Sequence, residues 1–191
     1  MPTQAEQPER GRIAEAPRSL IARASWGDTD ALEQLLRHYD PSMRLLAYRL
    51  VGQSMSDVLQ DAYIKAYRAL PDFRLDQGTF GGWLARIVYT SAIDHLRRER
   101  RHRRDVEAAA RDEGGATPEE RLLERLDFDI ALHALPLDQR AAVILVDGLG
   151  FSYDDAAMVL KLARGTLASR LHTARKALRA TLKGERPGQA P

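Results

Sequence analysis

The residues with the most distinctive chemistry in this sequence are cations, and they gather at two places. From Ala156 to Gly184 the chain has seven Lys and Arg residues and no Asp or Glu. Residues 97–104 add six Arg and one His beside a single Glu. Over the whole chain 29 basic and 27 acidic residues nearly cancel, so the distribution of charge matters more than its sum. Local positive fields favour polyanions such as nucleic acid, although a charge run most commonly marks a solvated helix face.

The sequence offers little for catalysis. Its five His, at positions 38, 95, 102, 133 and 172, are scattered, and no nucleophile elbow or Gly-rich phosphate loop is present. Asp57 and Asp61 could approach a metal, but two carboxylates without further ligands are weak evidence for one. There is no Cys, which excludes disulfide and thiolate chemistry. We therefore predict no catalytic residue, no metal and no cofactor, and the protein is not expected to be an enzyme.

Two helices must position the C-terminal cations. Ser152 with Asp155 three residues later is typical of a helix N-terminus, and a break near residues 161–164 precedes a longer second helix. That helix has an apolar stripe on one face, so the other face is predicted to be polar and exposed. The arrangement suits a helix-turn-helix whose second helix enters the DNA major groove. The stripe is Leu167, Leu171, Ala174, Leu178 and Leu182, and the polar face presents Thr166, Ser169, Arg170, Thr173 and Lys176.

Apolar residues recur at helical spacing in the rest of the chain as well, which predicts further helices. Asp30 with Glu33 resembles a capping box, and Pro41 is expected to interrupt the helix that follows. A loop with three glycines is expected over residues 71–82, and Trp83 is interpreted as a core residue more than a surface for bases. The helices are predicted over residues 31–39, 43–51, 57–70 (with Val58, Leu59, Ala62, Ala66, Tyr67 and Leu70 at helical spacing), 83–104, 119–135, 138–147, 153–162 and 165–183.

The predicted fold is all-α, with two small helical domains joined by a flexible linker. Residues 1–17 and 185–191 are expected to be disordered tails, the domains to span 18–104 and 122–184, and the linker to span 105–121 around Gly114–Pro118. The first residues contain no apolar targeting segment, and no stretch approaches the roughly 18 apolar residues that cross a bilayer. We expect a cytoplasmic protein without membrane insertion.

The C-terminal motifs resemble those of a known family. Residues 149–157 and 164–179 are similar to domain four of the extracytoplasmic-function (ECF) sigma factors, with the pattern GxSYxEIAxxLG…GTVKSRLHRARxxLR. The most specific matches are Gly165-Thr166, residues 169–172 and Ala174-Arg175. The preceding residues 135–145 resemble the LPxxxRxxxxL helix of the same family.

The N-terminal half resembles the same family independently. Residues 57–67 are similar to its DVxQExFxxxW helix, and residues 80–87 and 92–98 to FxxWLxxIAxNxAxDxLRR. The resemblance covers residues 20–104 and 122–182 in the family's order. The chain departs from the pattern at Lys161, where the turn usually has Gly, at Thr90 in place of Asn, and at Ala168 in place of Lys.

The resemblance implies a sigma factor that binds core RNA polymerase through the β′ clamp and the β flap. Such a protein recognises promoter −10 and −35 elements, helps to open the duplex, and is commonly held by an anti-sigma factor. It implies polymerase contacts at Asp57, Gln60 and Asp61; −10 contacts at Phe80, Arg86, Thr90, Asp94, Arg97 and Arg98; and −35 contacts at Arg164, Thr166, Ser169, Arg170, Thr173, Arg175 and Lys176. The loop 72–82 would border a pocket for an unstacked base, with Phe80 as its apolar wall.

Three other interpretations remain open at this point. A stand-alone helix-turn-helix regulator would explain residues 149–183 but not the N-terminal half. A protein-binding helical module, or an ordinary amphipathic hairpin, would not explain the absence of acidic residues along the second helix, because solvated helices usually mix both charges.

Overall fold

The computed structural model describes residues 13–74, 76, 78–109 and 123–182, with side chains described for all of these except 103–109 and 123–127. Within the described residues every regular element is helical, which confirms the predicted all-α fold. The N-terminal half contains α1 (Arg18–Ser25), α2 (Thr29–Val51), η1 (Gly52–Ser54), α3 (Met55–Ala69), η2 (Leu70–Asp72) and α4 (Phe80–Ala109). The C-terminal half contains α5 (Leu123–Ala134), α6 (Leu137–Val143), the π-helical turn η4 (Ile144–Gly148), α7 (Tyr153–Leu160) and α8 (Arg164–Leu182).

Helix α2 runs without interruption through Pro41, so the predicted break there is wrong. Proline removes one helical hydrogen bond, but Pro41 lies on the exposed face. The opposite face buries a continuous apolar stripe, which stabilises the helix on both sides of the proline. The helix begins where the Asp28 carboxylate accepts the Ala31 N–H at 3.0 Å, and not at the capping box predicted from Asp30 and Glu33. The stripe includes Leu35, Tyr39, Met43, Leu46 and Leu50.

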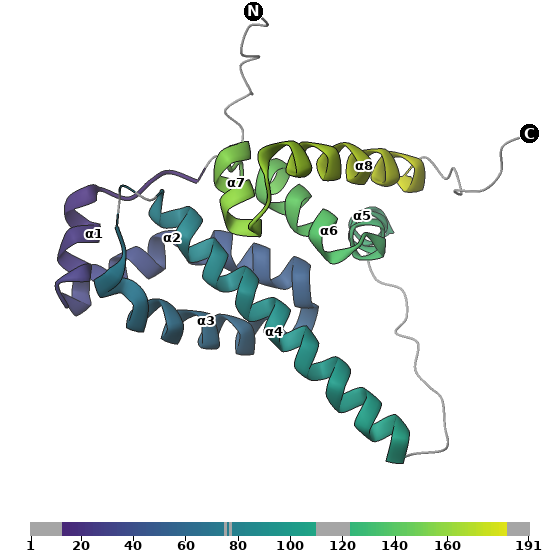
Figure 1. Cartoon of the computed structure of the whole chain (residues 1–191), viewed down its shortest axis with the longest axis horizontal. Coiled ribbons are helices and arrows are strands. Elements are labelled where there is room, and N and C mark those ends of the chain that lie inside the picture. The colour runs from purple at the N-terminus through teal and green to yellow at the C-terminus, as the bar shows by residue number, and fades with distance from the viewer. Residues whose placement is uncertain (1–12, 75, 77, 110–122, 183–191) are drawn as a thin grey trace, which may run out of the picture.

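Helix α4 begins at Phe80, earlier than predicted, because Thr79 caps it. The Thr79 hydroxyl accepts the Gly82 N–H at 3.1 Å, and the Thr79 carbonyl accepts the Trp83 N–H at 3.0 Å. Gly81 and Gly82 therefore belong to the first turn of a helix. A Cβ atom on Gly81 would lie 3.0 Å from the Tyr39 ring, so a larger residue here would press on the side chain of α2. Figure 1 shows the far end of α4 projecting from the body of the protein.

The core of the N-terminal half is built around aromatic rings. Phe80 is 1% exposed, and its ring centroid lies 5.3 Å from that of Tyr39, 5.4 Å from that of Phe73 and 5.2 Å from that of Trp83. Trp83 packs against this core, as the sequence predicted. Tyr67 was predicted to point inward with its helical neighbours, but it is 60% exposed on α3.

The C-terminal half forms the predicted helix-turn-helix. The Ser152 side chain caps α7 by accepting the Asp155 N–H at 3.1 Å. Lys161 ends α7 in the left-handed conformation with φ 54° and ψ 47°, the geometry that usually selects glycine. Along α8 four members of the predicted stripe, Leu167, Leu171, Ala174 and Leu178, are buried. The fifth, Leu182, is 49% exposed in the last turn of the helix, so its predicted burial is wrong.

The two halves pack together into one body. Helix α4 lies against α7, and the buried residues of both halves form one continuous cluster. Arg49 of α2 pairs with Asp129 of α5, and its guanidinium lies 5.2 Å from the centroid of the Phe128 ring. Arg140 of α6 donates to the Leu50 carbonyl at 3.4 Å. The predicted domains are thus in direct contact.

The described residues cover only part of the predicted tails and linker, and the domain boundaries stay a prediction. Residues 13–17 were assigned to a disordered tail, but Ala16 is 4% exposed and Ile13 packs against the core, while Ala14, Glu15 and Pro17 are exposed. Residues 105–109 of the predicted linker continue α4. The described chain does not include the rest of that linker (110–121), the first 12 residues or the predicted tail 185–191. None of the described helices combines the length and apolar character needed to span a bilayer.

Candidate functional site

One candidate surface lies on α4 and is formed by Thr90, Asp94, Arg97 and Arg98, which we call the α4 surface. Asp94, Arg97 and Arg98 are exposed, and Arg97 lies 3.9 Å from Asp94 through its Nη1 atom. The Thr90 hydroxyl donates to carbonyls of its own helix, with the Arg86 oxygen at 3.0 Å. Its lone pairs therefore remain available to accept a hydrogen bond.

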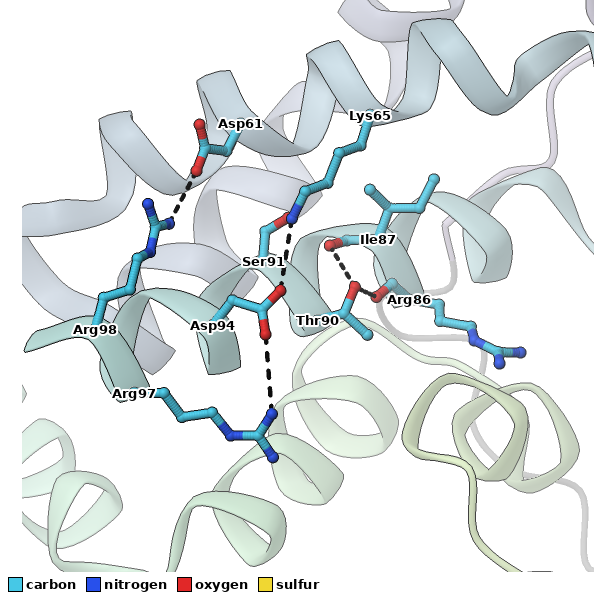
Figure 2. A network of polar contacts seen from close by, with 9 residues as sticks. All are labelled: Asp61, Lys65, Arg86, Ile87, Thr90, Ser91, Asp94, Arg97 and Arg98. Atoms are coloured by element: carbon cyan, nitrogen blue, oxygen red, sulfur yellow. Dashed lines mark hydrogen bonds and ion pairs between the residues drawn. The ribbon is translucent and has the colours of Figure 1, made fainter. Parts of the chain in front are cut away.

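A lysine on the neighbouring helix orders this surface. Lys65 of α3 donates from Nζ to the Ser91 hydroxyl at 3.0 Å, and the same Nζ lies 3.7 Å from Asp94 Oδ2 (Figure 2). Ser91 is fully buried beneath the α4 surface. Neither Lys65 nor Ser91 was predicted from the sequence, because their roles depend on how α3 packs on α4. The spacing of Ser91 and Asp94, which places them on one helix face, was the only sequence signal available.

The α4 surface is linked to a polar face of α3 with two carboxylates, which we call the α3 surface (Asp57, Gln60 and Asp61). Arg98 donates from Nη2 to Asp61 Oδ2 at 3.0 Å (Figure 2). Asp57 and Gln60 are exposed. The structure therefore joins residues that the sequence assigned to polymerase and to DNA.

An apolar groove of about 710 Å³ lies beside the α3 surface. Ile64 and Tyr67 line it, and they are 44% and 60% exposed. Large apolar side chains exposed together commonly mark an interaction site. The sequence missed this groove, because the periodicity assigned Tyr67 to the core.

Phe80 and Arg86 lie differently from the other predicted −10 residues. Phe80 is buried in the aromatic core, so its ring is not available as a wall for an unstacked base. Arg86 points away from the α4 surface in Figure 2, and it lines a cavity of about 120 Å³ together with Trp83 and Met158. Met158 belongs to α7, so the C-terminal half closes one side of this cavity.

The second candidate surface is the polar face of α8, which we call the α8 surface (Thr166, Ser169, Thr173 and Lys176). All four residues are exposed, while the apolar stripe on the opposite face is buried. Arg164 at the helix start is also exposed, 3.5 Å from Asp154. His172 and Arg179 are exposed on α8 as well and were not among the predicted contacts, although the acid-free composition of the helix had pointed to them.

Two predicted −35 residues are engaged by protein carboxylates. Arg175 donates from Nε and Nη2 to both oxygens of Asp147, at 2.9 and 2.5 Å, and from Nη1 to the Tyr153 hydroxyl at 3.3 Å. These bonds raise the pKa of Arg175 and hold it against the turn before α7. Arg170 is half-buried and lies 2.7 Å from Asp138 of α6. Both guanidinium groups are therefore paired with carboxylates of the C-terminal half in this arrangement, and their contacts with DNA stay predictions.

Comparison with known proteins identifies both halves. Residues 35–102 match the family model of sigma-70 region 2, and residues 125–178 match that of sigma-70 region 4. The chain is 36% identical over 180 residues to the RNA polymerase sigma-H factor of Pseudomonas aeruginosa, covering 86% of this chain and 92% of that protein. It is 36% identical over 175 residues to the ECF sigma factor SigM of Mycobacterium tuberculosis, covering 88% and 85%.

Solved structures agree with these matches. The sigma factor RpoE of Bartonella quintana, in complex with the anti-sigma factor NepR, superposes with a TM-score of 0.68 at 31% identity over 81% of this chain and 98% of that one. CnrH, in complex with the cytosolic domain of CnrY, gives a TM-score of 0.66 at 26% identity over 88% and 97%.

The match to region 2 accounts for the N-terminal half, which a stand-alone helix-turn-helix regulator would leave unexplained. The predictions of a non-enzymatic, DNA-binding transcription protein are confirmed. This chain belongs to the ECF sigma factors of the sigma-70 family, and it is an RNA polymerase sigma factor that directs transcription initiation.

Proposed function

We propose that this sigma factor recognises a −35 element with the α8 surface and a −10 element with the α4 surface. The observation that carries the proposal is the division of α8 into a buried apolar stripe and an exposed face of hydroxyls and cations without a single carboxylate. A helix of this kind can lie in the major groove, where hydroxyls contact base edges and cations contact phosphates.

On α8 we assign base reading to Thr166, Ser169 and Arg170, and phosphate contact to Lys176 and Arg164, with Thr173 beside them. Arg170 reaches a base when DNA replaces Asp138 as the partner of its guanidinium. Arginine can donate two hydrogen bonds to guanine, which makes it the strongest candidate for specificity.

On α4 the exposed guanidinium groups of Arg97 and Arg98 form a cationic track for the −10 strand, and the hydroxyl of Thr90 and the carboxylate of Asp94 offer acceptors. Arg86 and Trp83 border the cavity in which an unstacked base would lie. Aromatic and cationic groups together are what single-stranded DNA requires. Capture of that strand would help to open the duplex.

We infer that the α3 surface binds the β′ clamp and that the C-terminal half binds the β flap. Carboxylates at Asp57 and Asp61 suit a basic partner, and Ile64 and Tyr67 in the adjacent groove supply apolar area to bury. An exposed polar rim beside an apolar groove is the usual composition of a protein interface.

We further propose that the protein works in the cytoplasm, where polymerase and DNA are found, and that an anti-sigma factor holds it inactive. The solved structure of RpoE from Bartonella quintana is a complex with such a factor, which supports the proposal.

Run-off transcription with core enzyme on a library of genomic promoter fragments tests the central proposal. The protein should direct initiation from a subset of fragments that share two sequence elements. Arg170→Ala should relax preference at one position of the upstream element at a cost of about 1–3 kcal/mol. Unchanged preference at every upstream position in this variant would show that the base-reading face of α8 is assigned incorrectly.

A further inference from the structure

The segment before α1 is fixed to the N-terminal half at several points. Ala16 is buried, and its N–H donates to the Tyr39 hydroxyl at 2.9 Å. The His38 ring donates from Nε2 to the Ala14 carbonyl at 2.7 Å. Both partners lie on α2, so residues 14–16 follow a defined path across that helix.

Glu15 extends from this segment to the start of α4. Its Oε1 atom accepts the N–H of Phe80, the first residue of the helix, at 2.6 Å, although the two residues are 65 positions apart. The first N–H groups of a helix have no partner within the helix, and a carboxylate there also opposes the positive end of the helix dipole. Thr79 caps the Gly82 N–H from inside the chain, and Glu15 caps the Phe80 N–H from outside.

Close packing leaves little freedom at this point. A Cβ atom on Gly81 would lie 3.7 Å from Glu15 Oε2 and 3.0 Å from the Tyr39 ring. The C-terminal half faces the segment across a cavity of about 290 Å³ that Phe151 and Ser152 help to line. The hydrogen bonds described here for residues 14–16 are made to the N-terminal half.

The start of α4 sets the position of the residues that follow it. Arg86 lies six residues after Phe80, which is roughly 9 Å along a helix, and Thr90 follows one turn later. Because Phe80, Arg86 and Thr90 lie within the first three turns of one hydrogen-bonded helix, a rotation or shift at Phe80 also displaces these side chains. The contact of Glu15 therefore bears on the −10 residues without touching DNA.

We propose that Glu15 is a positioning residue for −10 recognition, because its carboxylate anchors the first turn of α4 and thereby fixes the register of the α4 surface and of Arg86. The proposal rests on the proposed function of α4. Glu15 lies outside residues 35–102, which match sigma-70 region 2. The sequence had placed it in a disordered tail.

The test compares Glu15→Ala and Glu15→Gln in the full-length protein with core enzyme. The matched control is Glu33→Ala, because Glu33 is an exposed glutamate on α2 that pairs with Arg37 on the same helix. The templates are a promoter recovered from the library and two derivatives, each with one base changed in the −10 or the −35 element. Initiation rate, core affinity and helical content are measured for every variant.

Glu15→Ala should reduce discrimination against the −10 derivative by roughly threefold to tenfold, the size expected for loss of a helix cap. Discrimination at −35 and core affinity should stay at wild-type values. Glu15→Gln should retain most of the discrimination, because its amide oxygen still accepts the Phe80 N–H. Amide exchange at residues 80–82 should be faster in Glu15→Ala than in Glu33→Ala.

The outcomes of this test distinguish the positioning role of Glu15 from the assignment of α4 to the −10 element. Wild-type discrimination at −10 in Glu15→Ala, or an equal loss at both promoter elements, would overturn the positioning role while leaving the assignment of α4 in place. A wild-type protein that does not discriminate the −10 derivative at all would overturn that assignment and, with it, this inference.

Discussion

Arg175 and Lys176 are neighbours in the sequence and carry the same charge, yet α8 places them in different environments. Arg175 turns back onto Asp147 and Tyr153, whereas Lys176 is exposed on the α8 surface. Periodicity indicates which residues of a helix are polar. It does not indicate which cation is already neutralised by an acid from another element, because that depends on tertiary packing.

The first prediction separates these two cations. Lys176→Ala should weaken binding to all DNA sequences alike and reduce the salt slope by roughly one unit, without changing the melting temperature. Arg175→Ala should instead lower the melting temperature, because it leaves the Asp147 carboxylate without its two donors. Salt titrations of duplex binding and thermal unfolding measure the two effects. A larger change of slope in Arg175→Ala than in Lys176→Ala would reverse the assignment.

The second prediction concerns Asp61, which lies between the proposed polymerase and DNA surfaces. Asp61→Arg should weaken binding to core polymerase by on the order of tenfold, since it places a cation where a basic partner is expected. Helical content should stay unchanged, because Asp61 is exposed to solvent in part. Asp30→Arg, a change of the same charge on the exposed side of α2, should bind core like wild type.

The variant Arg98→Ala tests whether weaker core binding in Asp61→Arg comes from a lost polymerase contact or from the lost ion pair with Arg98. It removes the partner of Asp61 but leaves the carboxylate in place. If Arg98→Ala weakens core binding as strongly as Asp61→Arg does, the ion pair matters for the structure of α4 and the proposed polymerase contact at Asp61 is incorrect.

At the scale of elements, the sequence predicted most helices from periodicity and capping residues. It predicted α7 and α8 closely, because Ser152 and the leucine stripe are local signals. It failed at α2, where the cost of Pro41 is offset by burial along the other face, and at the start of α4, where Gly81 lies in a helix close to the Tyr39 ring. The failure at α2 arises from packing between elements, which no local pattern contains. At α4 the Thr79 cap is a local signal, but the neighbouring glycines were interpreted as a loop.

The same distinction applies to the candidate site. The polar face of α8 could be predicted, since one helix defines it. The contact of Lys65 with Ser91, the pair of Asp61 with Arg98 and the anchor from Glu15 could not, because each joins residues of different elements. Phe80 was placed at the surface because the glycines beside it suggested a loop.

The third prediction tests the turn between α7 and α8. Lys161 has φ 54°, a conformation in which a side chain is disfavoured, so Lys161→Gly should raise the free energy of unfolding by roughly 0.5–1 kcal/mol. Lys176→Gly is the control within α8 and should lower it by about 1 kcal/mol. Chemical denaturation measures both. A destabilised Lys161→Gly protein would mean that the lysine side chain makes a contact worth more than the backbone strain.

At the scale of the whole molecule, His133 and its neighbours connect stability to pH. Partial burial and the guanidinium groups of Arg140 and Arg49 lower the pKa of His133, and Arg140 donates to its Nδ1 atom at 2.9 Å. His133 is therefore neutral in the folded protein over a wider range than in the unfolded chain. Its contribution to stability is fully present above the unfolded pKa of about 6.5 and is lost as the pH falls below it.

The fourth prediction follows from the lowered pKa of His133, which makes the folded protein less stable as the pH falls. The melting temperature should fall between pH 7 and pH 5.5, and the fall should be smaller in His133→Asn, which cannot take up a proton. His172→Asn is the matched control for the loss of one imidazole, because His172 is exposed on α8. Identical pH profiles for wild type and His133→Asn would exclude His133 as the titrating group.

The last prediction concerns the contact between the halves, in which α7 covers the cavity beside Arg86. Arg49 of α2 pairs with Asp129 of α5, so Arg49→Asp should place two carboxylates together and separate the halves. The radius of gyration should therefore rise in small-angle scattering. The double variant Arg49→Asp, Asp129→Arg should restore compaction in part, with a coupling energy of about 1–2 kcal/mol, between the values for exposed and buried pairs.

Arg44→Asp is the control, because Arg44 pairs with Asp40 within α2 and its reversal should leave the scattering unchanged. If Arg49→Asp is as compact as wild type, the packing of α4 against α7 holds the halves together without this ion pair.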